Sequence, residues 1–456
     1  MRHVTHTRLG VAIALMATLA GCSGPCDKID SINGPTLNAN GVDLTTYVAV
    51  GTSLTSGYES GGLVDRHQVH SFPALFATQI GKTVDISGTG TFTLPTINFD
   101  GIPALSEIKS YSPLIINNSG RTTGAPTNLA QNFAYHNLGI PGAILVDLVD
   151  TTFYHPPATP IRNNFTYFNI IQRTRGTILE QALSLAPTIM SVEYGANEIL
   201  GFAAVQGTNP SLGTGGIYAP LMTAALNGIH ATLPNTKVAV FNVPDVTAIP
   251  FFTTLSAFTV NTTTGAPMPL VGVNGACQPG DLVLLSAGGT IAAGTGIPAG
   301  GYNYLNPAAG SNGTPLPESV ILRVQEVLDT RTVIGQLNAV VDSVSARPFV
   351  AKVDLNGLLA TIASNGISIG GTLYTDDFVK GGLFSLDGVH PNDLGYALMA
   401  NTMIDAINAR FGCFVPPVNP LTYASTNASA LKPVTDRYPL VQSLDESFRM
   451  LFPKQP

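Results

Sequence analysis

The sequence has few charged residues, few cysteines and no long apolar run beyond its first segment. Charged residues make up 11% of the 456 residues, where about 25% is usual in soluble domains. The net charge of −7 and the scarcity of basic clusters argue against nucleic acid as a partner. Beyond the N-terminal segment no stretch reaches 18 uninterrupted apolar residues, so we expect that the mature chain does not cross a membrane.

The sequence also lacks a CxxC pair and any zinc-binding pattern of cysteines and histidines. His67 and His70 stand three residues apart, a spacing that two metal ligands on one helix could use. No cysteine or third histidine lies near them in sequence. We therefore expect a solvated histidine pair here and no metal site.

The N-terminal segment has the layout of an export signal. Arg2 and Arg8 precede a short apolar stretch, which ends in small residues before Cys22. The sequence Leu-Ala-Gly-Cys at 19–22 resembles the lipobox of bacterial lipoproteins. This resemblance implies cleavage before Cys22, lipidation of that cysteine and a lipid-anchored protein in the bacterial envelope, at the outer membrane or cell surface.

The remaining cysteines leave their pairing open. If Cys22 carries lipid, Cys26, Cys277 and Cys413 remain, and an odd number cannot all pair within one chain. An extracytoplasmic compartment permits disulfides, so a bond between Cys277 and Cys413 is possible, but their spacing does not decide it.

Strand-like and helix-like segments alternate along the chain. Strands are expected at 47–50, 188–194, 237–241 and 349–353, with a further one within 280–287, and helices at 71–81, 178–185, 218–233, 317–341 and 392–411. Serine, proline and glycine at the expected positions favour the first helix. Strands separated by helices of this length predict a parallel sheet covered by helices on both faces.

Polar residues follow two of these strands and precede the last helix. Ser53 comes directly after the first strand, and the YGANE sequence (194–198) ends the second. Asp387 and His390 stand three residues apart, so one loop can present both. Ligand sites in parallel sheets lie beyond the carboxyl ends of the strands. Taken alone, the stretch around Ser53 favours an ordinary turn serine, because turn serines far outnumber catalytic ones. GTSLT also does not match the G-x-S-x-G elbow of α/β-hydrolases.

Four short blocks resemble, in order, those of the SGNH or GDSL family of esterases and lipases. They are GTSL around Ser53, NLGIPGA at 137–143, GAN at 195–197 and DGVH at 387–390. Each block alone is a weak signal, but four in order are a strong one. The resemblance covers residues 44–248 and 316–412, and it implies a three-layer α/β/α sandwich with a central parallel, flavodoxin-like sheet.

The resemblance also implies a function, the hydrolysis of carboxylic esters without a cofactor or metal. Ser53 would be the nucleophile, His390 the base that takes its proton, and Asp387 the group that orients the imidazole. The substrate would be an ester that contains an acyl chain. The sequence does not determine the acyl length or the alcohol.

An oxyanion formed by attack on an ester needs preorganised donors. The resemblance assigns this role to the backbone N–H of Ser53, the backbone N–H of Gly142 and the side-chain amide of Asn197. Gly139, the other glycine of the block, is the alternative to Gly142.

Two residues depart from the usual family pattern. Thr52 stands where the family usually has aspartate, and Glu198 where aspartate often follows the asparagine. Neither position is nucleophile, base or oxyanion donor, so we expect the chemistry to survive. Two alternatives stay open: a carbohydrate O-deacetylase with the same triad, and a non-catalytic envelope lipoprotein on the same fold.

The expected organisation has six parts. These are a signal peptide at 1–21, a linker at 22–43, hydrolase core at 44–248, an insertion or lid-like subdomain at 249–315, more core at 316–412 and a proline-rich tail at 413–456. Within the insertion, Phe251, Phe252, Leu255 and Phe258 either line an acyl site or form the insertion's own core.

Overall fold

The computed structural model describes residues 36–85, 90–111, 114–151, 165–205 and 215–424. Contacts divide the chain into one unit that ends at Thr36 and a second that begins at Leu37, and all but one of the described residues belong to the second. The expected signal peptide, Cys22, Cys26 and most of the expected tail lie outside the described residues. The rest of this section concerns the second unit.

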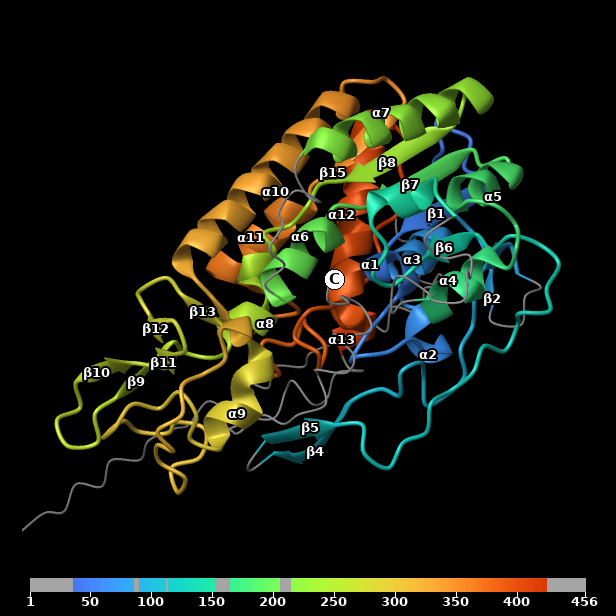
Figure 1. The fold of residues 1–456 in the computed structure, drawn as a ribbon. Coiled ribbons are helices and arrows are strands. Elements are labelled where there is room, and N and C mark those ends of the chain that lie inside the picture. Colours follow the sequence, from blue (N-terminus) through green and yellow to red (C-terminus); the bar gives the residue numbers. More distant parts are fainter. Residues whose placement is uncertain (1–35, 86–89, 112–113, 152–164, 206–214, 425–456) are drawn as a thin grey trace, which may run out of the picture. The chain divides into compact units, whose positions relative to one another are not determined.

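A five-stranded parallel sheet forms the centre of this unit (Figure 1). Its strands are, in spatial order, β15 (Val350–Val353), β8 (Lys237–Phe241), β7 (Ile189–Glu193), β1 (Tyr47–Gly51) and β6 (Asn137–Gly139). In the register of the sheet, Gly51 pairs with both Gly139 and Glu193. The carboxyl ends of β6, β1 and β7 are therefore level with one another.

Alternation along the strands builds two cores, one on each face of the sheet. Successive side chains of a strand point to opposite faces, and even-numbered residues such as Val50 and Val192 join one core while odd-numbered residues such as Tyr47 and Ile189 join the other. The first core is covered by α5 (Ile178–Ser184), α7 (Gly215–Thr232) and α10 (Val324–Ser345), and the second by α3 (Phe72–Gln79) and α12 (Asp393–Phe411). The three-layer α/β/α sandwich is thus confirmed.

The other elements of the described residues are short. The helices are α1 (Ser53–Ser56), α2 (Asp65–Gln68), α4 (Phe165–Gln172), α6 (Ala196–Val205), α8 (Pro250–Thr253), α9 (Gly288–Ala292), α11 (Leu355–Asn365) and α13 (Leu421–Ala424), with 3₁₀ turns at Leu145–Leu148, Val246–Ala248, Leu285–Ala287 and Glu318–Val320. The strand pairs are β2 (Val84–Asp85) with β3 (Phe92–Thr93), β4 (Glu107–Tyr111) with β5 (Leu114–Asn117), β9 (Phe258–Val260) with β10 (Pro267–Pro269), β11 (Val271–Gly272) with β12 (Gly275–Ala276), β13 (Leu282–Val283) with β14 (Ile321–Leu322), and β16 (Ile367–Ile369) with β17 (Thr372–Tyr374).

The long helix expected at 317–341 begins later than its pattern indicates. A 3₁₀ turn and β14 occupy its first positions, because β14 pairs with β13 and the chain is extended there. Helix α10 starts only at Val324, where the Glu326 side chain accepts a hydrogen bond from the backbone N–H of Arg323 at 2.7 Å. The strand expected within 280–287 is likewise shortened to the two residues of β13, since a 3₁₀ turn follows it.

Cys277 and Cys413 do not form the disulfide that their compartment would permit. Both are buried free thiols. They belong to different cores, Cys277 to the one beneath α10 and Cys413 to the one beneath α12. Burial raises the pKa of the Cys277 thiol to about 11, so we expect an unreactive thiol there at neutral pH.

Two phenylalanines of the expected insertion lie in the core rather than on an open wall, and Phe258 is partly buried. Phe251 and Phe252 are fully buried, and they share a core with strand residues of the central sheet. The N–H of Phe251 donates to the carbonyl of Gly388 at 2.8 Å, which joins α8 to the loop that carries Asp387.

Within the described parts of the chain, no helix has the length and apolarity needed to cross a membrane.

We predict that Phe252→Ala destabilises the protein by about 3–5 kcal/mol, because it removes a fully buried ring and leaves a cavity. Urea unfolding followed by circular dichroism measures this change. Val273→Ala is the control: Val273 lies in the same insertion but is 64% exposed, and we expect a change within about 0.5 kcal/mol. Equal, small effects of the two substitutions would contradict the core assignment.

Candidate active site

The turn from β1 into α1 presents Ser53 at the carboxyl end of the sheet. Thr52 is the N-cap of α1, and Ser53 is the first residue of that helix. A side chain at Gly51 would not fit, since its Cβ would lie 2.1 Å from Thr55 Oγ1 and 2.7 Å from the carbonyl oxygen of Glu193. The backbone N–H of Ser53 is among the first N–H groups of a helix, which have no partner within the helix.

Ser53, His390 and Asp387 form a continuous hydrogen-bonded row. His390 Nε2 lies 2.8 Å from Ser53 Oγ, and His390 Nδ1 lies 2.9 Å from Asp387 Oδ2. All three residues are buried. Because a carboxylate only accepts, Nδ1 carries the ring proton and Nε2 is free to accept the Ser53 hydroxyl proton.

Four further donors hold the Asp387 carboxylate. The N–H groups of Val389 and His390 donate to Oδ1 at 2.9 Å each, Ser385 Oγ donates to Oδ1 at 3.0 Å, and the N–H of Gly61 donates to Oδ2 at 3.0 Å. Burial alone would raise the pKa of Asp387, but the charge of His390 and these hydrogen bonds outweigh it and lower the pKa. Asp387 is therefore ionised at neutral pH.

The loop after α1 supplies part of this support. The N–H of Ser60 donates to Ser385 Oγ at 2.9 Å, so Ser385 is fixed on one side by this loop and on the other by Asp387. The ring of Tyr58 lies 4.7 Å from that of His390, measured between ring centroids. Sequence reasoning did not identify the loop, because its contacts are to residues more than 320 positions away.

The two candidate glycines differ in the state of their N–H groups. The N–H of Gly139 donates to Asn137 Oδ1 at 3.0 Å and is already used. Among the residues that the structure describes, the N–H of Gly142 has no hydrogen-bond partner, and the residue adopts a φ of +77°. This difference favours Gly142 over Gly139 as an oxyanion donor.

Asn197 lies next to the same segment. Its side-chain amide donates one hydrogen to the carbonyl of Ala143 at 2.8 Å, which leaves the second hydrogen for another acceptor. Asn197 follows β7 and Gly142 follows β6, and both strands flank β1 in the register set by Gly51. The loops that carry the three expected donors thus leave the same edge of the sheet.

Glu198 has a structural role in this arrangement. Its Oε1 accepts a hydrogen bond from the N–H of Leu145 at 2.7 Å. The bond ties the start of α6 to the segment that follows Gly142. Glu198 therefore joins α6 to the residues directly after the NLGIPGA block.

Glu193 is another residue of this site that sequence reasoning missed. Its Oε2 accepts from the N–H of Thr52 at 3.0 Å, from Thr52 Oγ1 at 2.7 Å and from Thr55 Oγ1 at 3.0 Å. One buried carboxylate on β7 thus holds the turn that presents Ser53. Burial raises the pKa of Glu193 to about 7, while the hydrogen bonds of Thr52 and Thr55 act in the opposite direction. The available signal was an acidic residue inside an otherwise apolar strand.

The expectation of a solvated histidine pair is wrong. His67 and His70 are half-buried, and the Nδ1 atom of each lies about 3 Å from a carboxylate oxygen of Asp393, at 3.0 and 2.9 Å. Asp393 is in the first turn of α12. Its distance of more than 320 positions from His67 hid this contact in the sequence.

Comparisons with known proteins give similarities of fold only. No family model and no curated protein matches the chain. Among solved structures, it is similar to an extracellular lipase of Streptomyces rimosus, with 13% identity, 80% of this chain and 99% of that one covered and a TM-score of 0.33. It is also similar to phospholipase A1 of Streptomyces albidoflavus, with 12% identity, 81% of this chain and 100% of that one covered and a TM-score of 0.33. A third similar structure is a GDSL-like lipase of Parabacteroides merdae, with 12% identity, 82% of this chain and 98% of that one covered and a TM-score of 0.27. With TM-scores this low, we assign neither an activity nor residue roles from these likenesses.

We predict that Glu193→Gln changes how stability depends on pH. The pKa of Glu193 is raised from 4.5 to about 7 in the folded chain. Its contribution to the free energy of unfolding is therefore complete below about pH 4.5 and is lost as the pH rises through about 7. Glutamine keeps the acceptor oxygen without the charge. We expect the free energy of unfolding of the variant to rise relative to that of wild type, by up to about 3 kcal/mol, as the pH increases from about 4.5 to 7.

Unfolding free energies measured by urea titration at several pH values between 4 and 8 test this prediction. Asp329→Asn, at an exposed position on α10, is the control for removing one carboxylate. Parallel pH profiles for wild type and Glu193→Gln would show that Glu193 does not titrate in this range.

Proposed function

We propose that the protein is a serine hydrolase that cleaves carboxylic esters through an acyl-enzyme on Ser53. The observation that carries the proposal is the 2.8 Å contact between His390 Nε2 and Ser53 Oγ, with ionised Asp387 on the other ring nitrogen. A serine hydroxyl becomes a competent nucleophile when such a base takes its proton. The assignments of Ser53, His390 and Asp387 as catalytic residues belong to this proposal.

In the proposed acylation step, Ser53 Oγ attacks the ester carbonyl while its proton moves to His390 Nε2. Asp387 stabilises the imidazolium that forms and keeps Nδ1 protonated. The N–H groups of Ser53 and Gly142 and the free amide hydrogen of Asn197 donate to the oxyanion. His390 then gives the proton to the departing alkoxide oxygen. In the second half, His390 takes a proton from water, the hydroxide attacks the acyl carbon, and Ser53 leaves with that proton.

The substrate class has two candidates. Esters with a longer acyl chain are the first, by resemblance to the lipases. Phe251 and Phe252 are buried in the core, however, and so give no support to a long acyl site. A carbohydrate O-deacetylase, whose acetyl group needs no such wall, is therefore the second candidate.

We propose further that Cys22 carries lipid and that the protein is anchored to the bacterial envelope, at the outer membrane or cell surface. Support comes from the Leu-Ala-Gly-Cys sequence at 19–22 and from Ser23, where aspartate would favour inner-membrane retention. Several acyl chains on one residue give stable anchoring. Labelling of the expressed protein with radioactive palmitate, lost in Cys22→Ala, tests the anchor.

We predict that Ser53→Ala abolishes ester hydrolysis, with a loss in kcat on the order of 10⁶ as for the serine of a protease triad. Initial rates with chromogenic acetyl, butyryl, octanoyl and palmitoyl esters provide the measurement, and a fluorophosphonate should label wild type but not the variant. Ser364→Ala, at an exposed position on α11, should leave the rates unchanged.

The same series separates the alternatives. A kcat/KM that rises with acyl length favours the lipase-like substrate, and a maximum at acetyl favours the deacetylase. Turnover that survives Ser53→Ala would refute the role of Ser53. A wild type that hydrolyses no ester and resists the fluorophosphonate would point to the non-catalytic lipoprotein.

We predict that Asn197→Ala lowers kcat by about 10²–10³ with little change in KM, because a lost oxyanion donor weakens binding of the transition state alone. Steady-state kinetics on the best ester measures both constants. Asn227→Ala, at an exposed position on α7, is the control. Thermal unfolding is followed in parallel, since Asn197 also bonds Ala143. A drop in kcat of less than about threefold would remove Asn197 from the oxyanion site.

A further inference from the structure

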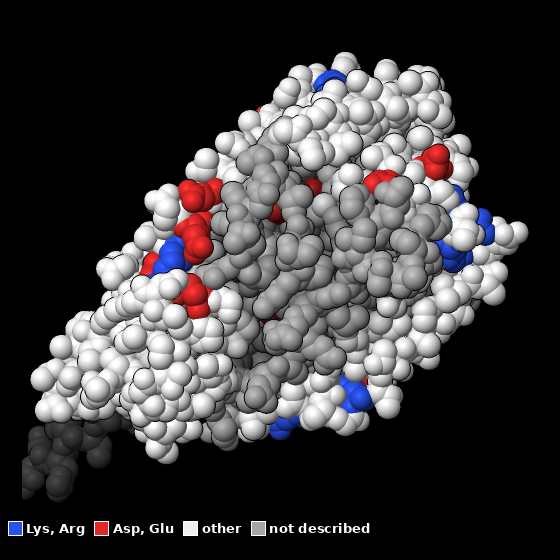
Figure 2. Space-filling view, viewed as in Figure 1, with Lys and Arg blue, Asp and Glu red and all other residues white. Residues whose placement is uncertain are grey.

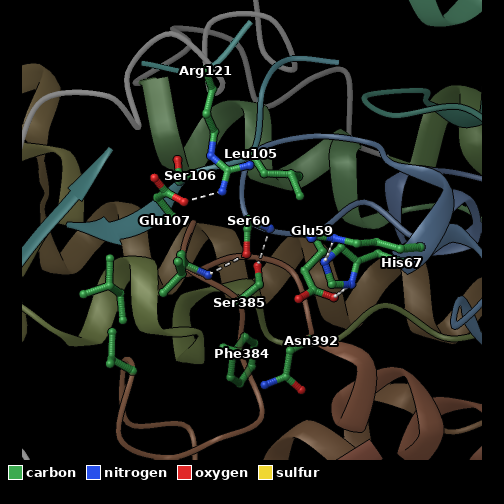
Figure 3. Close-up of a pocket in the computed structure, with 14 residues that line it drawn as sticks. Glu59, Ser60, His67, Leu105, Ser106, Glu107, Arg121, Phe384, Ser385 and Asn392 are labelled. Atoms are coloured by element: carbon green, nitrogen blue, oxygen red, sulfur yellow. Dashed lines mark hydrogen bonds and ion pairs between the residues drawn. The ribbon is translucent and has the colours of Figure 1, made fainter. Parts of the chain in front are cut away.

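Four side chains that the proposed reaction does not use converge beside the active site: Glu59, His67, His70 and Asp393. His67 Nδ1 lies 3.2 Å from Glu59 Oε2 and 3.0 Å from Asp393 Oδ1, and His70 Nδ1 lies 2.9 Å from Asp393 Oδ2. One ligand atom from each of Glu59, His67 and Asp393 fits within 4.8 Å of the others. Figure 3 shows Glu59 and His67 facing each other at the edge of a cavity of about 310 Å³.

Glu59 and Asp393 are buried, and the described residues neutralise the negative charge of these two carboxylates only in part. Glu59 Oε2 is buried and makes no hydrogen bond with any described residue. A buried carboxylate without a hydrogen bond is costly unless a proton or a cation neutralises it.

The separations of His67 Nδ1 from Glu59 and from Asp393 match the edges of a metal coordination shell. Bonds of about 2.0–2.2 Å from a metal to nitrogen or oxygen place neighbouring ligand atoms about 2.8–3.6 Å apart, in octahedral or tetrahedral geometry. The distances from His67 Nδ1 to Glu59 Oε2 and to Asp393 Oδ1, 3.2 and 3.0 Å, fall inside this range. Hydrogen-bonded histidine–carboxylate pairs have similar distances, but one proton on His67 Nδ1 cannot serve both carboxylates equally.

We propose that Glu59, His67 and Asp393 bind a divalent transition-metal ion of the Zn²⁺ type, and that His70 holds Asp393 in place through its other carboxylate oxygen. An imidazole nitrogen beside two carboxylates suits such an ion, whereas Ca²⁺ and Mg²⁺ prefer oxygen ligands alone. No cysteine or third histidine lies near His67 and His70 in the sequence. The structure supplies two carboxylates, Glu59 from the loop after α1 and Asp393 from the first turn of α12.

Binding requires one local adjustment. A metal on His67 Nδ1 leaves the ring proton on Nε2, where Arg66 Nε now donates at 3.3 Å. Arg66 is exposed, and its guanidinium lies over the ring of Phe99 at 4.8 Å from the centroid. Its side chain can therefore turn away and leave Nε2 free to donate to solvent.

The site would act on the fold rather than in the ester chemistry. Glu59 directly precedes Ser60 and Gly61, whose N–H groups hold Ser385 and Asp387. A metal shared by Glu59 and Asp393 ties this loop to α12. The cation would thus stabilise the support of Asp387, and its binding can be measured whether or not the protein hydrolyses esters.

Zinc binding to the untagged, metal-stripped full chain tests the proposal. Equilibrium dialysis with Zn²⁺, and separately with Ca²⁺, is followed by elemental analysis of bound metal. We expect one Zn²⁺ per chain, no comparable Ca²⁺ binding, and at least about tenfold weaker Zn²⁺ binding in Glu59→Gln and in His67→Gln, as for disturbed metal sites. His230→Gln, which removes an exposed histidine outside the cluster, should bind as wild type does.

Two further measurements keep the test decisive. The absorption bands of Co²⁺ in place of Zn²⁺ should appear in wild type and disappear in the variants. Zn²⁺ should raise the Tm of wild type more than that of His70→Gln, in which Asp393 loses a contact. His70 is half-buried, so this variant should fold even if Glu59→Gln does not. Absence of Zn²⁺ binding, or binding of unchanged affinity in a folded Glu59→Gln/His67→Gln variant, would overturn the proposal, and a proton on Glu59 would then account for the cluster.

Discussion

The register of three parallel strands at Gly51 is the constraint on which the candidate site depends. Gly51 pairs with Gly139 on one side and with Glu193 on the other, so β1, β6 and β7 end at the same level. Ser53, Gly142 and Asn197 follow these strands within a few residues. A side chain at Gly51 would collide with Thr55 and with the backbone of Glu193. The close approach of backbone and turn at this one position therefore sets the geometry of the loops that follow.

Buried carboxylates hold the elements that this register brings together. Glu193 fixes the turn of α1, and Glu198 ties α6 to the segment after Gly142. Asp387 gathers donors from its own loop and from the loop after α1. Each carboxylate joins segments that are distant in the chain, and each would be costly to bury without these donors. The chain as a whole is poor in charge, and among the described residues on the face shown in Figure 2 the charged side chains are few.

Much of the layered fold was predictable because it follows from local periodicity. Alternation and helix length correctly indicated β8, α5 and α12, which are regular elements with one buried face. The start of α10 was wrong, since β14 is determined by a tertiary pairing with β13 and not by its own residues. The GTSL and DGVH blocks placed Ser53, Asp387 and His390 as candidates, and the structure brings these three into contact.

What the sequence could not indicate are contacts between residues that carry no shared local pattern. Glu193 stands within a strand whose other residues are apolar or small, and only the neighbouring turn shows why a carboxylate is there. Thr52 looked like the loss of a negative charge beside Ser53, but its hydroxyl and N–H both donate to Glu193. A carboxylate therefore contacts this turn from the neighbouring strand β7. Because burial raises the pKa of Glu193 to about 7, its ionisation changes near neutral pH. The turn that presents Ser53 is thus held by a group that titrates near neutrality, although the hydrogen bonds from Thr52 and Thr55 oppose the rise of its pKa.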